Sequence, residues 1–258
     1  MSIPLQNHTL NRNEFLHLLM KQEAESTILE IGPLNRPLVK TQFTKYFDLL
    51  PTLELKAKAL SEGLDPNTVP EIDFHEPTGN LAVVNLEFDN VVSSHCIEHQ
   101  PDLIKHLIQC SRLLDKQDSK YWLVVPDKRY CFDALIPESS LMEIIRAHEE
   151  QATRPSIWKV IEHRALTTHN DPTLHWNSNS GNQNQDIKVR FNAAKAEFYA
   201  SPNQYIDVHC WQFTPKSFSN IINALFELEI IDFQVEKVWE TRENDLEFFA
   251  ILKKMSRI

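Results

Sequence analysis

The chain has 258 residues, a formal net charge of −10, 42 % hydrophobic residues and 24 % charged residues. These values are ordinary for a globular protein with a core, and the negative charge disfavours a broad surface for nucleic acid or anionic membrane. Only 4 residues are glycine, and the chain contains neither G-x-G-x-x-G nor a P-loop. We therefore expect no loop that cradles phosphates.

The first part of the chain alternates predicted helices with short strands. Apolar residues at helical spacing predict a helix at 11–25, and a run of strong helix formers predicts another at 53–62. Short runs rich in β-branched and aromatic residues predict strands at 27–32, 45–48 and 69–74. Alternation of this kind is typical of a parallel α/β sheet.

A strand at 88–94, a helix at 99–114 and a strand at 120–126 continue the pattern. The last of these is almost wholly apolar, as a central parallel strand should be. Segment 127–215 then breaks the alternation, and it is rich in His, Asn, Pro and aromatic residues. It is too long for one crossover, so we interpret it as an inserted region that covers the substrate.

A helix at 216–228 and strands at 230–240 and 246–253 end the predicted sheet. About five residues separate these strands, too few for a parallel crossover, so they form an antiparallel hairpin. We predict a doubly wound, Rossmann-like α/β fold whose seven-stranded sheet ends in this hairpin. The predicted units are the first half of the Rossmann-like domain, the insert, and the closing helix and hairpin, at 1–126, 127–215 and 216–258.

Targeting and redox signals are weak in this sequence. The start has no basic segment followed by an apolar one, and no apolar run approaches the roughly 18 residues of a membrane span. None of the 4 cysteines is in C-x-x-C spacing, which favours reduced thiols in the core. We expect a cytoplasmic protein without a membrane span, and the sequence predicts no oligomeric state.

Ligands of open parallel sheets bind at the carboxyl ends of the strands, so the residues there matter most. A carboxylate accepts hydrogen bonds from a ribose diol or an ammonium group, and it repels phosphate. Acids at several strand ends, without a phosphate loop, favour a positively charged nucleoside such as S-adenosylmethionine. The alternative is that they are solvated turn residues. The polar residues predicted at the strand ends are Glu30 and Gly32, Asp48, Asp73, Ser94 and His95, and Asp127.

Four segments carry a resemblance to a known family. Residues 28–39 (ILEIGPLNRPLV) resemble the first motif of class I SAM-dependent methyltransferases, with proline after the single glycine. Residues 88–99 (FDNVVSSHCIEH) resemble the fourth-strand motif of type 11 methyltransferase-domain proteins. Residues 125–133 (VPDKRYCFD) and 207–215 (DVHCWQFTP) are similar to hallmarks of one bacterial subgroup. The resemblance runs from residue 28 to about residue 252.

The resemblance implies S-adenosyl-L-methionine as cofactor, and it assigns strand-end positions to parts of that molecule. The usual G-x-G loop is here Gly-Pro-Leu, so the backbone must approach the cofactor differently. The implied cofactor residues are Glu30, Gly32 and Pro33 beside the methionine part, Asp48 at the ribose, Leu49, Asp73 and Phe74 at the adenine, and Ser94 and His95 at the methyl-donor end.

Transfer of a methyl group to a hydroxyl requires removal of the hydroxyl proton, by a histidine or a carboxylate. The candidates are His209 and His163, with Asp127 as an orienting or alternative basic group. Each has a structural alternative, because Asp127 can pair with Arg129 and His209 can anchor the insert. The subgroup is associated with cell-surface glycan synthesis, so the resemblance implies a small-molecule or saccharide-like acceptor. Further candidates for an acceptor pocket are Arg129, Tyr130, Arg154 and Trp211.

Residues 95–99 (HCIEH) also resemble the H-x-x-E-H zinc motif of inverzincins. That motif needs a helix, a third ligand and a catalytic water, whereas His95 is predicted at a strand end. Four histidines in or near the insert are interpreted as structural, and we assign no metal ligand while leaving open whether the insert binds a metal. They are His163, His169, His175 and His209.

A second hypothesis is a binding or scaffold protein that keeps the fold but does not transfer a methyl group. The altered Gly-Pro-Leu loop motivates it. A third hypothesis, an NAD-dependent oxidoreductase, is strongly disfavoured because the pyrophosphate loop is missing.

Overall fold

A computed structural model describes residues 9–23, 25–114, 119–181, 186–202 and 204–255 of the chain. Its sheet has seven strands in the order β3-β2-β1-β4-β5-β7-β6. Strands β1 to β5 pair in parallel, and β7 pairs antiparallel with both β5 and β6. The predicted fold class and its terminal hairpin are therefore confirmed. The strands are β1 Ile28–Ile31, β2 Thr44–Asp48, β3 Phe74–His75, β4 Asn90–Ser94, β5 Lys120–Pro126, β6 Phe233–Trp239 and β7 Glu247–Lys254.

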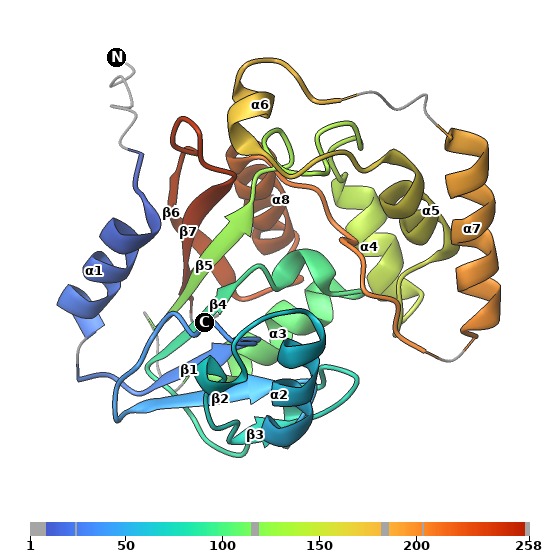
Figure 1. Ribbon diagram of the computed structural model, residues 1–258. Helices are drawn as coiled ribbons and strands as arrows, with labels where there is room; N and C mark the ends of the chain where they lie inside the picture. The colour runs from blue at the N-terminus through green and yellow to red at the C-terminus, as the bar shows by residue number, and fades with distance from the viewer. Residues whose placement is uncertain (1–8, 24, 115–118, 182–185, 203, 256–258) are drawn as a thin grey trace, which may run out of the picture.

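The described residues form eight α-helices, and α4, α5 and α7 gather on the side toward which β1 and β2 point (Figure 1). Local sequence sets where several of them begin. Asp102 caps α3 by accepting a hydrogen bond from the Lys105 N–H, and Pro215 opens α8 behind the capping residue Thr214. The helices are α1 Arg12–Glu23, α2 Thr52–Ser61, α3 Leu103–Leu113, α4 Leu141–Glu149, α5 Ile157–Leu166, α6 Pro172–Trp176, α7 Ile187–Ala200 and α8 Pro215–Glu227.

Both faces of the sheet are covered, as the doubly wound fold requires. On one face α1 inserts Phe15, whose ring stacks on Phe249 at 4.7 Å between centroids and meets the rings of Trp122 and Trp239 at a steeper angle. On the other face α3 and α8 bury their apolar stripes in the larger core cluster. Within the described residues, no helix is both long and apolar enough to cross a membrane.

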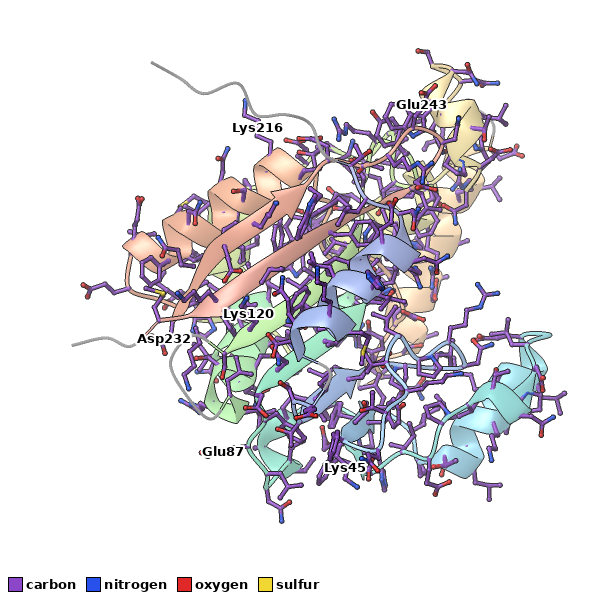
Figure 2. All side chains as sticks on the ribbon, turned by 90° about the vertical axis from the view of Figure 1, so that its left-hand side faces the viewer. Lys45, Glu87, Lys120, Lys216, Asp232 and Glu243 are labelled. Carbon is purple, nitrogen blue, oxygen red and sulfur yellow. The ribbon has the colours of Figure 1, made fainter. Side chains whose placement is uncertain are left out.

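The two edges of the sheet are easily told apart in Figure 2. Lys120 and Asp232, which open β5 and precede β6, lie toward one edge, while Glu243, in the loop after β6, lies at the opposite edge. The second edge is formed by the carboxyl ends of the parallel strands. Segment 127–215 leaves from this edge after β5, and its described residues form α4 to α7.

The third strand was predicted incorrectly. The prediction was 69–74, but β3 is only Phe74–His75, and the preceding residues form a short 3₁₀ helix, Pro66–Thr68, and irregular chain. Pro70 has no N–H for a strand ladder, and β3 is the outermost strand of the sheet, where pairing is weakest. Asp73 therefore precedes β3 and does not end it. The helix predicted at 99–114 begins only at Leu103, because Pro101 and the cap Asp102 come before it.

Replacement of Phe15 by alanine tests the packing of α1. Phe15 is fully buried among three aromatic rings, so Phe15→Ala leaves a cavity and should lower the free energy of unfolding by about 3–5 kcal/mol. Urea unfolding followed by circular dichroism measures this loss. The control Leu60→Ala, 66 % exposed on α2, should change stability by less than about 0.5 kcal/mol. Equal losses in the two variants would contradict the packing.

Candidate functional site

The loop after β1 brings bare backbone to the edge where the strands end. Gly32 has φ +70, a conformation that favours glycine, and its N–H donates to the Phe47 carbonyl at the end of β2. A Cβ placed on Gly32 would lie 3.7 Å from the Cys96 sulfur, so space is available but the backbone would be strained. Leu34 and His95, near the same edge, also have positive φ, 44° and 49°. Such strained positions gather at functional sites.

Glu30 uses its carboxylate to shape that loop. It is buried on β1, and its two oxygens accept hydrogen bonds from the backbone N–H groups of Leu38 at 2.7 Å and Val39 at 3.0 Å. Burial raises the pKa of Glu30 to about 7, although the two N–H groups oppose the rise. Pro33 is buried within the same loop. Glu30 thus holds the loop after β1 in place through these two hydrogen bonds.

Asp48 ends β2 beside this loop. It is buried, and its Oδ1 accepts from the Leu49 N–H at 2.7 Å. Burial raises the pKa of Asp48, while backbone N–H groups of Leu49, Leu34 and Leu50 work against the rise. The contact with Leu34 joins the loop after β1 to the end of β2. Asp48 and Gly32 are therefore neighbours, as the strand-end argument predicts.

Asp73 does not share this environment, and its predicted place at a strand end is wrong. It lies opposite Tyr46 in the body of β2, where its carboxylate accepts from Lys45 Nζ at 2.7 Å and from the Tyr46 N–H at 2.9 Å. Phe74, half-buried, packs against the main core. The acid just beyond β3 is Glu76, whose carboxylate caps the following turn through Thr78 and Asn80. Sequence reasoning missed Glu76 because the strand boundary was misplaced.

Ser94 and His95, at the end of β4, belong to an ion-pair network. Arg12 of α1 donates to both oxygens of Glu247 on β7, at 2.9 and 2.6 Å, and to Ser94 Oγ at 3.2 Å. His95 Nε2 lies 2.9 Å from the same Glu247 carboxylate. The hydrogen bonds from Arg12 and His95 outweigh burial and lower the pKa of Glu247 to about 2. No local pattern could have linked Arg12 to Glu247, which lie 235 residues apart in the chain.

The Asp127 carboxylate is engaged by two neighbouring side chains. It is fully buried, and it accepts from Arg129 Nη2 at 2.6 Å and from Thr241 Oγ1 at 2.6 Å. The Asp127 hydrogen bond is the main cause that raises the pKa of Arg129. This geometry favours the structural alternative for Asp127, because both of its carboxylate oxygens already accept hydrogen bonds from Arg129 or Thr241.

His209 and His163 do come together. His209 is buried, and its Nδ1 lies 2.6 Å from Asp133 Oδ2, while its ring centroid is 5.7 Å from that of His163. Burial, with a smaller contribution from His209, lowers the pKa of His163 to about 4. The other nitrogen of His209, Nε2, faces Glu98, 3.9 Å from Oε1. Glu98, just beyond β4, was not singled out as a site residue in the sequence.

A hollow of about 720 Å³ opens between α4, α5 and α7, and Arg154 and Trp211 are among its lining residues. Arg154 donates to backbone carbonyls of Phe198, Ser201 and Pro202, and Trp211 donates to the Gln100 carbonyl at 2.6 Å. Arg154 thus helps to hold the insert together, and Trp211 ties the insert to the segment that follows β4. Elsewhere, Arg129 pairs with Asp127, and the Tyr130 ring stacks on Trp176 at 3.9 Å between centroids.

No family model and no curated protein matches this chain. Solved structures do match. A protein assigned as a Zn-dependent alcohol dehydrogenase from Rhodobacter sphaeroides has a TM-score of 0.52 at 13 % identity, over 97 % of this chain and 92 % of its own. A SAM-dependent methyltransferase from Methanosarcina mazei scores 0.45 at 15 % identity, over 97 % and 100 % of the two chains.

A third match, an S-adenosylmethionine-dependent methyltransferase from Clostridium acetobutylicum, has a TM-score of 0.46 at 10 % identity, over 96 % of this chain and 93 % of its own. At 13 % identity the likeness to the Rhodobacter protein extends to the fold alone. The two methyltransferase matches have TM-scores below 0.5 and therefore carry no argument.

The ion-pair network predicts a pH-dependent contribution to stability. The pKa of Glu247 is lowered to about 2 in the folded protein, so its contribution is fully present above about pH 4.5 and is lost as the pH falls toward 2. Glu247→Gln should lower the free energy of unfolding by up to about 3 kcal/mol at pH 7, and by much less at pH 3. Urea unfolding at both pH values measures the difference. The control is Glu236→Gln, because Glu236 is an exposed residue of β6 that pairs with Lys120. This change should lower the free energy of unfolding by less than about 1 kcal/mol at pH 7. A loss for Glu247→Gln that is the same at both pH values would contradict the ion pair.

Proposed function

We propose that the protein is a S-adenosylmethionine-dependent methyltransferase whose acceptor is a small molecule or saccharide-like compound, methylated on oxygen. The observation that carries this proposal is the pairing of Gly32, with its positive φ, and buried Asp48 at adjoining strand ends. Such a corner offers close backbone approach and a carboxylate acceptor without any phosphate loop. It suits a nucleoside that lacks phosphates.

In this proposal the chain's own residues bind and orient the cofactor. Asp48 accepts hydrogen bonds from the ribose diol, with Leu49 beside the adenine, and Gly32 and Pro33 form the floor beside the methionine part. Glu30 fixes that floor through its two backbone hydrogen bonds. The bound cofactor supplies an activated methyl group on a sulfonium, so alignment of the acceptor is the main task left to the protein.

Ser94 and His95 line the methyl-donor end in the proposed site. The Arg12–Glu247 pair holds them there, because Arg12 donates to Ser94 and Glu247 contacts His95. This gives α1 a role in closing the cofactor site, since Arg12 lies at its first position. Phe74 is a more distant candidate for the adenine edge, and Asp73 is already engaged by Lys45.

Proton removal from the acceptor is assigned to the buried group around His209. Asp133, 2.6 Å from Nδ1, orients the ring and leaves Nε2 to face inward. His163 is less suited to this role because its pKa of about 4 makes it a weak base at neutral pH. The helices of segment 127–215 would cover the acceptor and exclude water.

The second candidate is a protein that binds the cofactor without turnover. Asp127 favours it, because this residue of the VPDKRY segment is fully taken up by Arg129 and Thr241. The two candidates differ in one measurement, the release of S-adenosylhomocysteine in a broad screen of acceptors. Binding of the cofactor with no release on any acceptor would support the second candidate.

Removal of the Asp48 carboxylate should weaken cofactor binding. Two hydrogen bonds to a buried carboxylate are lost in Asp48→Ala, so the dissociation constant for S-adenosylhomocysteine should rise about 100-fold, as measured by calorimetry. Asp65→Ala is the control, because Asp65 lies in an exposed turn and caps only a short 3₁₀ helix. Its affinity should match that of the unaltered protein. Lack of binding by the unaltered protein would overturn the proposed function.

Replacement of His209 should separate turnover from binding. His209→Ala removes the proposed proton acceptor, so turnover should fall about 10²- to 10⁴-fold while the affinity for S-adenosylhomocysteine stays within about twofold. The control is His148→Ala, which removes a histidine of α4 that lies 3.0 Å from Asp102, the capping residue of α3. It should keep full turnover. Undiminished turnover in His209→Ala would remove His209 from the mechanism.

A further inference from the structure

Glu98 is the most unusual charged side chain among the described residues. It is 0 % exposed, and neither of its carboxylate oxygens has a hydrogen-bond partner there. Buried carboxylates are normally paired or hydrogen-bonded, because loss of hydration is otherwise uncompensated. A bound cation would compensate the charge of the carboxylate and account for this arrangement.

Imidazole nitrogens surround the Glu98 carboxylate. His99 Nε2 lies 3.8 Å from Oε1, and His209 Nε2 lies 3.9 Å from the same oxygen. One ligand atom from each of these three residues can be chosen so that all three lie within 4.8 Å of one another. His95 adds a further nitrogen, Nδ1, 3.9 Å from Oε1. These separations are too long for direct hydrogen bonds.

The position of the proton in the His99 and His209 rings depends on the partner of Nδ1, and it decides whether Nε2 has a lone pair for a cation. His209 Nδ1 lies 2.6 Å from Asp133, and His99 Nδ1 lies 2.9 Å from Asp207. A carboxylate accepts a hydrogen, so the contact with Asp133 fits a neutral His209 ring that carries its proton on Nδ1 and offers the lone pair of Nε2 to a cation. His99 Nε2 can serve in the same way when the ring proton is on Nδ1, on the side of Asp207. Carboxylate–histidine pairs of this kind are the usual second shell of a metal site.

We propose that Glu98, His99 and His209 form a binding site for a divalent transition-metal ion, with Zn²⁺ as the ion that they fit best. Two imidazole nitrogens and one carboxylate are a common ligand set for Zn²⁺, whereas Mg²⁺ and Ca²⁺ prefer oxygen ligands alone. Ligand atoms about 2.1 Å from a tetrahedral ion lie about 3.4 Å apart. The 3.8 and 3.9 Å separations therefore need only a few tenths of an ångström of contraction.

The backbone holds the ligands in place from two distant segments. The N–H groups of Cys210 and Trp211 donate to the Glu98 carbonyl at 2.7 and 3.1 Å. Tyr205 Oη donates to the His99 carbonyl at 3.0 Å. The chain between α7 and α8 thus runs back across the end of β4 (Figure 1). It brings His209 opposite a short 3₁₀ helix, Ile97–His99.

Three protein ligands leave at least one position on the ion for water or another oxygen. Use of that position rests on the proposed function: an acceptor hydroxyl bound there would lose its proton more easily, because a bound cation lowers the pKa of a coordinated oxygen. The acceptor class that fits is one that presents a second oxygen beside the hydroxyl, such as a vicinal diol or a hydroxy acid. His209 would then act as a metal ligand in place of its role as base, and the hydroxyl proton would pass to solvent water as the alkoxide oxygen stays on the ion.

The test is metal binding by the full chain after treatment with a chelator and its removal. Zn²⁺ is titrated in competition with a chromophoric chelator, and Co²⁺ is titrated by its visible absorption. We expect one equivalent of each to bind, a rise in melting temperature with Zn²⁺, and no such response to Mg²⁺. Glu98→Gln should lower the Zn²⁺ affinity at least about 100-fold, and Asp133→Asn, which alters only the orientation of His209, by about 10- to 100-fold.

His169→Gln is the matched control, because the stacked rings of His169 and His175 form another histidine pair, 4.2 Å between centroids, outside the proposed site. It should bind Zn²⁺ as the unaltered chain does. Circular dichroism checks that each variant is folded, and Asp133→Asn keeps the test informative if Glu98→Gln is not. Three results would overturn the site: no stoichiometric uptake of Zn²⁺ or Co²⁺, full affinity in Glu98→Gln, or loss of binding in His169→Gln.

A protonated histidine paired with Glu98 is the competing arrangement, and absence of metal uptake would support it. Binding of S-adenosylhomocysteine is measured on the same samples. Metal uptake without S-adenosylhomocysteine binding would overturn the proposed function and keep the metal site. S-adenosylhomocysteine binding without metal uptake would do the reverse.

Discussion

The two hydrogen bonds that Cys210 and Trp211 donate to the Glu98 carbonyl hold the insert onto the sheet. They anchor the return of a segment of almost ninety residues, 127–215, to the end of β4. His209 precedes Cys210, so the same bonds fix its ring over the Glu98 side chain. The buried group at this junction therefore exists only while the insert is docked, and both the proposed proton acceptor and the proposed metal site depend on that docking.

The acidic residues of this edge fall into two electrostatic classes, which the sequence alone does not distinguish. Glu30 and Asp48 accept their hydrogen bonds from backbone N–H groups, and burial raises the pKa of each although more distant cations, Arg12 at Glu30 and Lys58 at Asp48, oppose the rise. Glu247 meets Arg12 and His95, and its pKa is lowered. Carboxylates of the first class are sensitive to any charge that enters the site. A cationic ligand would reverse their shifts, since it favours the ionised form.

Prediction from the sequence worked where one local signal decided the outcome. The apolar run 120–126 became β5 with the predicted bounds, and the short connection before β7 identified the hairpin. It failed for Asp73, because Pro70 shortened an edge strand. Contacts such as Arg12–Glu247 and His209–Glu98 join distant parts of the chain, so only the folded arrangement reveals them. The HCIEH segment was set aside as a metal site because His95 is predicted at a strand end, and the third ligand of the proposed site, His209, comes from another segment.

The scarcity of glycine has a structural consequence at this edge. Leu34 and His95 adopt positive φ, which costs a non-glycine residue about 1–2 kcal/mol. Such a conformation persists only when neighbours hold it. The neighbours here are carboxylates, because Asp48 receives the Leu34 N–H and Glu247 binds the His95 ring. The strand-end acids therefore stabilise the strained backbone as well as offering acceptors to a ligand. Loss of Asp48 or Glu247 would relax this backbone, so the shape of this edge and its charge are coupled.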